Sequence, residues 1–208
     1  MAPVLVLELG GGSVRLGFAG HEPRIEPNCR GEPWPRGAAA YGQEVYGLGS
    51  CRLRRPLRRG LLLDLELQRR ILEPVLARLD KEGHDLRRCQ ALVVLAPLTP
   101  ELVAQELLAL LVEDLGLLEA SWVDSSAVAL KSWGLARQPR PCSTVLHLGF
   151  SACFAQPCIE GKAIASAGRR MPVGGRVLTN LLLDGSTRIG QCCGGVRQSL
   201  RWKFFRRA

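Results

Sequence analysis

The chain has 208 residues, of which 47% are hydrophobic and 23% are charged. This composition is sufficient for a buried core and argues against a wholly disordered protein. We predict no membrane-spanning helix, because the richest apolar stretch, Leu107–Val112, is far shorter than the roughly 20 residues that a bilayer requires. The amino terminus lacks a basic segment followed by an apolar run, so we expect an intracellular protein without a secretory signal.

The net charge of +9 is unevenly distributed. Six basic residues and no acidic one lie between Thr187 and Ala208. A second basic run consists of Arg52, Arg54, Arg55, Arg58 and Arg59. Such patches can bind nucleic acid, anionic lipid or an acidic protein. A solvent-exposed loop and tail are the simpler interpretation, so we expect protein partners rather than nucleic acid.

The eight cysteines do not form a disulfide framework or a metal-binding pattern. No two of them have the C-x-x-C spacing, and none of the three histidines is near a cysteine pair. In a reducing compartment we expect most of them to be small, buried hydrophobic side chains, and we expect no structural metal.

In chain order, the first predicted elements are two strands joined by a glycine turn. Val4–Leu7 is a short apolar run, the glycines Gly10–Gly12 follow it, and Ser13–Phe18 alternates apolar and polar residues. Residues 21–60 are rich in Pro, Gly and Arg and show little periodicity. We therefore expect a loop region there, which could include a small insertion.

The middle of the chain predicts helices around a buried strand. Apolar residues in Leu65–Leu79 have helical spacing, and Pro74 should bend or shorten that helix. Ala91–Leu95 is a continuous apolar run of strand length. Thr99 is expected to cap a further helix, which Gly116 is expected to end.

The strand–glycine–strand pattern then occurs a second time. After a short apolar segment near Trp122, a helix is predicted over Ser125–Ala136, followed by a Pro/Arg linker. Val145–Leu148 leads to Gly149, and Ala152–Gln156 forms the returning strand. Two such hairpins indicate a weak internal duplication. Glycine turns let backbone amides approach a phosphate, although most tight glycine turns bind none.

Five segments in the same order resemble the actin family. They are Gly17-Phe18-Ala19-Gly20 with Pro23-Arg24, Ala96–Pro100, Ser126–Leu130, Pro157 with Glu160-Gly161, and Gly174-Gly175-Arg176 with Leu178-Thr179. Their spacing matches the family from about residue 4 to residue 183. The resemblance implies an α/β, actin-like fold (RNase-H-like, of the hexokinase type) with two lobes, and ATP with a divalent cation between them.

The resemblance also divides the chain into regions. Residues 1–140 would form the first lobe, with a shortened small subdomain at about 21–60, and residues 141–183 would start the second lobe. Residues 184–208 match no part of the family, and we predict a basic tail there. Our hypothesis is that this tail comes from an alternative splice or reading frame, which transcript sequencing would test.

The resemblance identifies six candidate nucleotide-binding residues. They are Glu8, Gly10, Gly11, Gly12, Arg15 and Gly149. Glu8 matches the family's cation-holding aspartate, and Arg15 matches its phosphate-binding lysine. The alternative is that Glu8 and Arg15 are ordinary strand residues without a role in binding.

Three further positions depart from the family's catalytic pattern. His147 and Phe150 stand where the second loop of the family has acidic residues, and Ser126 stands where the family has the glutamine that orients water. Phosphoryl transfer requires cation-held phosphates and an oriented nucleophile, and magnesium prefers oxygen ligands to imidazole. We therefore predict a degenerate site without enzymatic activity and without a metal, and only the resemblance suggests ATP as a cofactor.

The functional prediction is a non-catalytic actin-like protein that binds or scaffolds other proteins. The expected partner is actin or an actin-associated complex, in the cytoplasm at the cytoskeleton, with the nucleus as the alternative compartment. Three other functions remain open: a weak ATP-binding conformational switch, a poorly folded truncated isoform, and a basic adaptor for nucleic acid or lipid.

Overall fold

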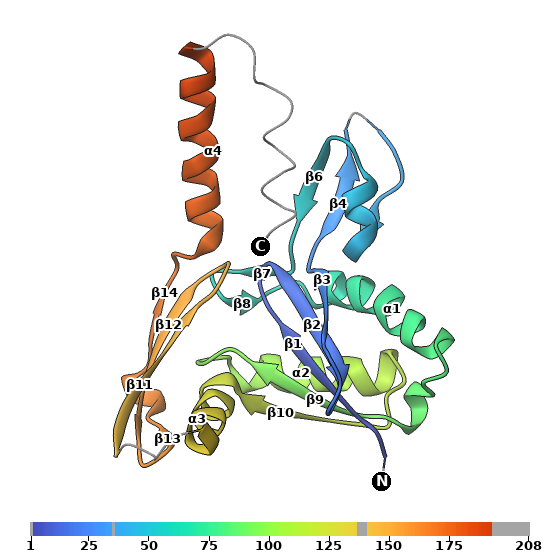
Figure 1. The fold of residues 1–208 in the computed structure, drawn as a ribbon. Coiled ribbons are helices and arrows are strands. Elements are labelled where there is room, and N and C mark those ends of the chain that lie inside the picture. The colour runs from blue at the N-terminus through green and yellow to red at the C-terminus, as the bar shows by residue number, and fades with distance from the viewer. Residues whose placement is uncertain (1, 35, 137–140, 193–208) are drawn as a thin grey trace.

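The computed structural model describes residues 2–34, 36–136 and 141–192. Figure 1 shows two sheets beside each other, together with a smaller sheet and the long helix α4 (Gly175–Cys192) that both project from the same end of the molecule. The mixture of sheets and helices agrees with the predicted α/β fold class.

The larger sheet has five strands in the order β10-β9-β1-β2-β3. The predicted first hairpin is formed by β1 (Val4–Leu9) and β2 (Ser13–Phe18), which are antiparallel, and β3 (Arg24–Pro27) extends it. On the other side, β9 (Gln90–Leu95) and then β10 (Glu119–Asp124) run parallel to β1. The first hairpin is therefore enclosed by strands on both edges.

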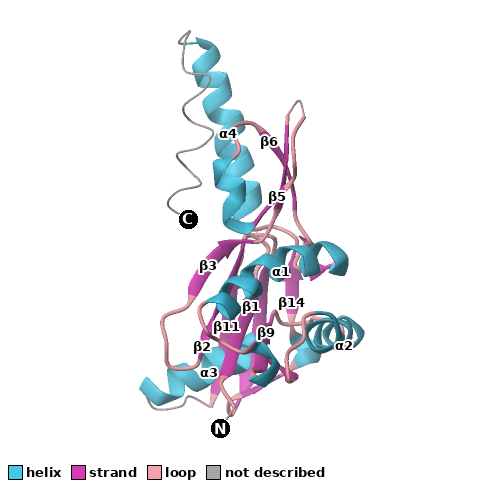
Figure 2. Cartoon of the chain, turned by 90° about the vertical axis from the view of Figure 1, so that its right-hand side faces the viewer, coloured by secondary structure: helices cyan, strands magenta, loops and turns pink. Residues whose placement is uncertain are grey.

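Helices cover both faces of this sheet. Figure 2 shows α1 (Leu65–Lys81) and α2 (Glu101–Ala109) on one side and α3 (Ser125–Ala136) on the other. Successive strand residues point to opposite faces, so one face of each central strand joins the core against α1 and α2. This core includes Leu5, Leu7, Val93, Leu95, Leu72, Leu76, Leu107 and Leu111.

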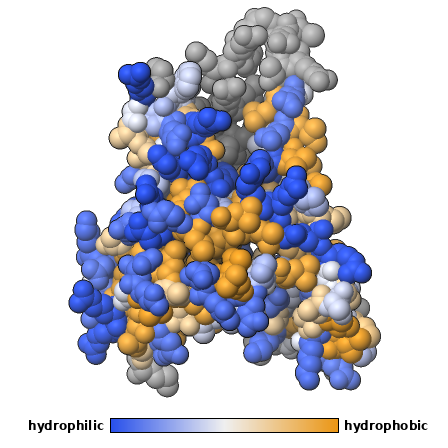
Figure 3. Space-filling view, turned by 180° about the vertical axis from the view of Figure 1, so that it is seen from behind, coloured by the Kyte–Doolittle hydropathy of each residue, from blue (hydrophilic) through white to orange (hydrophobic). Residues whose placement is uncertain are grey.

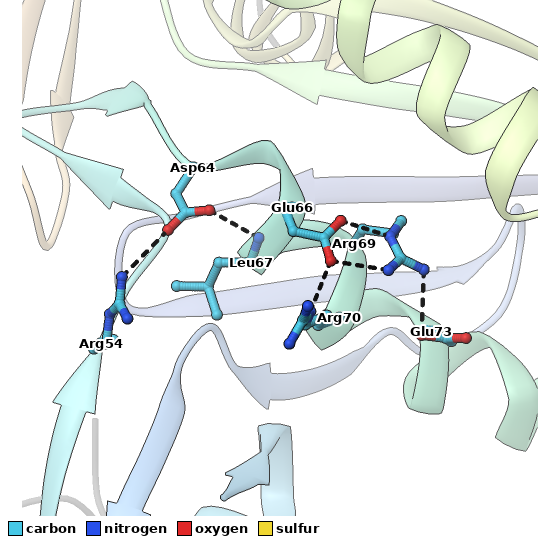
Figure 4. A network of polar contacts seen from close by, with 7 residues as sticks. All are labelled: Arg54, Asp64, Glu66, Leu67, Arg69, Arg70 and Glu73. Atoms are coloured by element: carbon cyan, nitrogen blue, oxygen red, sulfur yellow. Dashed lines mark hydrogen bonds and ion pairs between the residues drawn. The ribbon is translucent and has the colours of Figure 1, made fainter.

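Helix α1 begins with a side-chain cap. A carboxylate oxygen of Asp64 accepts the backbone N–H of Leu67 at 2.9 Å, and the other oxygen lies 3.8 Å from an Arg54 guanidinium nitrogen (Figure 4). Glu66 accepts hydrogen bonds from the next two arginines of the helix, Arg69 and Arg70, and these bonds lower the pKa of Glu66 to about 2. These contacts fix the point at which α1 begins.

The predicted helices differ from the structure at Thr99, whereas Pro74, which was expected to bend or shorten its helix, leaves α1 17 residues long. Pro74 lies inside α1 and does not shorten it, because apolar residues before and after the proline, such as Ile71 and Val75, are buried on the same helix face. Thr99 does not cap α2; the first residue outside that helix is Pro100, and the Thr99 hydroxyl donates to the Ala96 carbonyl at 2.7 Å instead.

Helix α2 continues as one π-helical turn, Leu110–Asp114. The helical segment then ends before Gly116, as expected.

The expectation of a loop over residues 21–60 is wrong. This region contains β3, β4 (Arg30–Pro33), β5 (Ala40–Tyr41), a 3-10 helix (Gly42–Gly47), β6 (Cys51–Arg54) and β7 (Leu57–Arg58), and β8 (Leu61–Leu62) follows directly. Strands β5, β4 and β6 form a three-stranded sheet, which we call the small sheet. Strands of two to four residues are too short to show an alternating pattern, which explains why the sequence did not indicate them.

The second hairpin consists of β11 (Cys142–Leu148) and β12 (Cys153–Ile159), with His147 opposite Phe154. The other edge of β12 pairs with β13 (Lys162–Ala163) and β14 (Arg169–Met171). Among the described strands, β11 pairs only with β12. The chain then enters α4, which extends past residue 183 to Cys192. The rest of the predicted tail, 193–208, lies outside the described residues.

The cysteines only partly follow the expectation of burial. Cys29, Cys89 and Cys158 are buried, whereas Cys142 is exposed. Within the described ranges, no group of three His, Cys, Asp or Glu side chains is placed to hold a metal ion. In the same ranges, no helix has the length and apolar character needed to cross a membrane.

Candidate functional site

A cleft of about 420 Å³ lies where the turns of the two hairpins meet. We call Gly10–Gly12 the first loop and Gly149–Ser151 the second loop. All six residues predicted to face a nucleotide line this cleft: Glu8, Gly10, Gly11, Gly12, Arg15 and Gly149. They come together because β1 and β11 each end in a glycine turn at the cleft. The cleft thus has the location expected from the duplicated hairpins.

The two loops are in direct contact. A Cβ atom built on Gly11 would lie 2.5 Å from the Cβ of Ser151, and one built on Gly12 would lie 3.0 Å from the Cγ of Phe150. Only glycine allows the backbone to come this close. Phe150 therefore packs against the first loop.

The turn between β7 and β8 closes against the second hairpin. The backbone N–H of Gly60 donates to the Ser151 hydroxyl at 3.0 Å, and a Cβ on Gly60 would lie 2.7 Å from the Phe154 ring. Gly60 and the preceding Arg59 both have positive φ, +78° and +53°. The turn therefore lines the cleft through Gly60, and the Arg59 side chain is not part of the lining.

Arg55 links the two loops. One of its guanidinium nitrogens donates to the carbonyl of Gly12 at 2.9 Å and to the carbonyls of Gly11 and Asn28 at 3.3 Å each. Its guanidinium carbon lies 4.7 Å from the centroid of the Phe150 ring, within the range of a cation–π interaction. The same side chain thus contacts both sides of the cleft.

The sequence did not single out Arg55. It belongs to a basic run that we interpreted as solvent-exposed, and Arg52, Arg54, Arg58 and Arg59 are indeed exposed. Arg55 is partly buried, and this burial lowers the pKa of its guanidinium. No local pattern distinguishes it from its neighbours, because its contacts come from residues far away in the sequence.

A buried amide pair supports the first loop. The side-chain N–H of Asn28 donates to the Gly10 carbonyl at 2.9 Å, and the Asn28 and Gln68 side chains exchange hydrogen bonds of 3.1 and 3.2 Å. Both residues are 0% exposed. The sequence did not indicate the pair, although Gln68 is a polar residue on the apolar face of a predicted helix.

Glu8 and Arg15 are cross-strand neighbours in the first hairpin. A guanidinium nitrogen of Arg15 lies 3.1 Å from both carboxylate oxygens of Glu8. The two side chains are about half-exposed. The candidate phosphate-binding cation is therefore already paired with the candidate cation-holding acid.

His147 contacts Ser126 and not the second loop's glycine. The His147 Nε2 lies 3.2 Å from the Ser126 hydroxyl oxygen, and the backbone N–H of Ser126 donates to Asp124 at 2.6 Å. Burial lowers the pKa of His147, while the Asp124 and Glu8 charges act in the opposite direction. Ser126 is 0% exposed, so its hydroxyl is not accessible to a reacting water.

The neighbouring Ser125 lines the cleft, and its buried hydroxyl has no hydrogen-bond partner among the described residues.

Known proteins are similar to this chain over most of its length. A family model described as actin matches residues 1–188. Proteins named actin-related protein 6 from Oryza sativa, subspecies indica and japonica, are each 32% identical over 192 residues. The match covers 87% of this chain and 44% of each of those relatives. A protein of the same name from Arabidopsis thaliana is 28% identical over 200 residues, covering 88% of this chain and 46% of the relative. The chain therefore spans less than half the length of these relatives.

Proposed function

Since the chain belongs to the actin family, we propose that it is a non-catalytic actin-like protein that binds or scaffolds other proteins and whose nucleotide cleft has lost its chemistry. The main support is the packing of Phe150 and Ser151 against Gly12 and Gly11. In the family, phosphates are expected between two such loops. Here the two loops contact each other directly at one side of the cleft, which leaves less room between them for phosphates.

The charged groups of the cleft also support this proposal. Arg15 is paired with Glu8, so the positive charge available to a phosphate is reduced. His147 presents an imidazole where an acid is expected, and magnesium prefers oxygen ligands. We therefore assign no reaction step to a nucleotide or a metal at this site.

A binding role is supported by apolar side chains on the surface. Figure 3 shows such side chains along α4, where Leu178 and Leu181 are exposed, and Leu148 at the end of β11 is exposed as well. Contiguous exposed apolar surface often marks a protein interaction site. An actin or actin-associated partner, and a cytoplasmic or nuclear location, remain predictions.

The first experiment is a phosphate-release assay with ATP on the 208-residue chain. We expect no release above the buffer control. Release that Glu8→Ala abolishes would contradict the proposal, and Glu44→Ala, which changes an exposed glutamate outside the cleft, is the matched control.

A weak ATP-binding switch is the second candidate. Its support is the cleft volume of about 420 Å³ together with the Ser125 hydroxyl, which has no hydrogen-bond partner within the described part of the chain. Thermal unfolding with ATP up to about millimolar concentration separates the two candidates, because a ligand raises the melting temperature only if it binds the folded state. A rise that Arg15→Ala removes would favour the switch, and no rise would favour the scaffold.

The binding role itself needs a direct measurement. Sedimentation velocity of the chain mixed with purified monomeric actin should show a complex if actin is the partner. Leu148→Asp should weaken a complex that uses the β11 surface, whereas Glu44→Ala should leave it unchanged. Identical sedimentation with and without actin would exclude actin as the partner.

A further inference from the structure

The Arg55–Phe150 contact joins two parts of the molecule that are far apart in the sequence. Arg55 directly follows β6, so it lies at the base of the small sheet. Phe150 is the central residue of the second loop. The guanidinium is bound to the first loop by carbonyl acceptors and to the second loop by the aromatic ring. Arg55 is connected to the small sheet and Phe150 to α4, which are the two elements that project from the same end of the molecule.

On the Phe150 side, the projecting element is α4. The backbone N–H of Gly175 donates to the Gly149 carbonyl at 3.0 Å, and the N–H of Arg176 donates to the Phe150 carbonyl at 2.9 Å. The second loop therefore supplies the cap of α4, because the first amides of a helix have no partner within the helix. A displacement of the backbone of the second loop would therefore displace the start of α4.

On the Arg55 side, the projecting element is the small sheet. This sheet and α4 face each other across a hollow of about 530 Å³, which is lined by Trp34, Tyr46 and Leu53 from the small-sheet region and by Leu183 from α4. Figure 1 shows the two elements projecting from the same end of the molecule. Their separation depends on how their bases are joined.

We infer that the Arg55–Phe150 contact is a built-in clasp that holds the small sheet and α4 at a fixed separation through protein contacts alone. Arg55 suits this role because three backbone carbonyls orient its planar guanidinium against the ring. The clasp requires both partners, the cation and the aromatic face. It does not depend on whether the cleft binds a nucleotide.

Hydrogen exchange of the 208-residue chain, followed by mass spectrometry, tests this inference. Phe150→Ala should accelerate amide exchange in residues 174–178 and 55–60 by about tenfold or more, because losing a desolvated cation–π contact makes local opening easier. Arg55→Lys, which retains the charge but not the planar group, should give the same pattern. Exchange in α1 should not change in either variant.

Two controls make the result specific. Phe150→Tyr keeps an aromatic face and should restore the wild-type exchange rates. Arg58→Ala removes an exposed arginine from the same run and should have no effect.

Unchanged exchange at the start of α4 in both Phe150→Ala and Arg55→Lys would overturn the inference. An equal acceleration throughout the chain, α1 included, would overturn it as well, because the contact would then contribute to general stability only. Repeating the measurement with ATP separates the two proposals. Protection by ATP would contradict the proposed scaffold function and would leave the clasp intact.

Discussion

The two glycine hairpins have the same local design but different surroundings. In the first, β1 lies between β2 and β9, and Leu7 is 0% exposed. In the second, β11 is an edge strand of the described sheet, and Leu148 is 82% exposed. A strand–glycine–strand sequence therefore specifies a hairpin, whereas burial is decided by which strands and helices pack against it.

The equivalent positions before each turn show the opposite contrast. Glu8 of the first hairpin forms a half-exposed ion pair with its cross-strand neighbour Arg15. His147 of the second hairpin lies opposite Phe154 and makes a partly buried contact with Ser126. A surface ion pair thus dominates the environment of Glu8, whereas desolvation dominates the environment of His147.

The largest expected effect concerns burial. Leu7→Ala should lower the free energy of unfolding by about 2–5 kcal/mol, because it removes a fully buried side chain and leaves a cavity. Leu148→Ala should change it by less than about 0.5 kcal/mol, since most of that side chain is exposed. Urea unfolding of both variants measures the difference, and equal losses would refute the contrast between the hairpins.

The second-largest effect on stability is expected at the buried Asn28–Gln68 amide pair, which supports the first loop. Gln68→Ala should destabilise the protein by about 1–3 kcal/mol, because it leaves the buried Asn28 amide with one partner fewer. Gln105→Ala, at an exposed helix position, is the control. If the two variants unfold at the same urea concentration, the amide pair does not anchor the loop.

A smaller, pH-dependent effect is expected at His147. Its folded-state pKa lies below the usual value of 6.5, so below that pH the unfolded state binds more protons than the folded state. The contribution of the neutral His147 imidazole to the free energy of unfolding is complete above pH 6.5. It is lost as the pH falls through the lowered folded-state pKa. His147→Asn should flatten the dependence of the urea midpoint on pH between about 6.5 and 5.

The exposed His21 provides the comparison for that measurement, through His21→Asn. A pH profile that is unaltered by His147→Asn would show that desolvation of this imidazole is unimportant for stability.

The smallest effect belongs to Glu8 and Arg15. A double-mutant cycle with Glu8→Gln and Arg15→Gln should give a coupling energy of about 0.2–1 kcal/mol, as is usual for solvent-exposed pairs. The coupling should decrease in high salt. A coupling energy well above this range would mean that the cleft screens the pair from water.

Much of the fold was predictable because long elements have a clear period. Strand β2 follows from alternation, α1 from helical spacing and β9 from a continuous apolar run, and the actin-family resemblance is confirmed by the match over residues 1–188. The small sheet was not predictable, since strands of two to four residues contain at most two repeats of the strand period, too few to show a pattern. The Thr99 cap failed because Pro100 occupies the position before the first helical residue.

The candidate site was predictable in outline and not in detail. The positions of both glycine loops followed from the repeated hairpin, so their meeting in one cleft was expected. Arg55 could not be recognised, because its role depends on a ring that a different part of the chain supplies. The burial of Ser126 was hidden for the same reason, since His147 covers it from the second hairpin.

The capping of α4 has a consequence for electrostatics. A helix start normally offers several free amides and about half a positive charge, and proteins often use it to bind anions. In α4, the amides of Gly175 and Arg176 are directed at carbonyl oxygens of the chain itself. These two amides are therefore not available to an anion, and they attach the start of the helix to the hairpin below it.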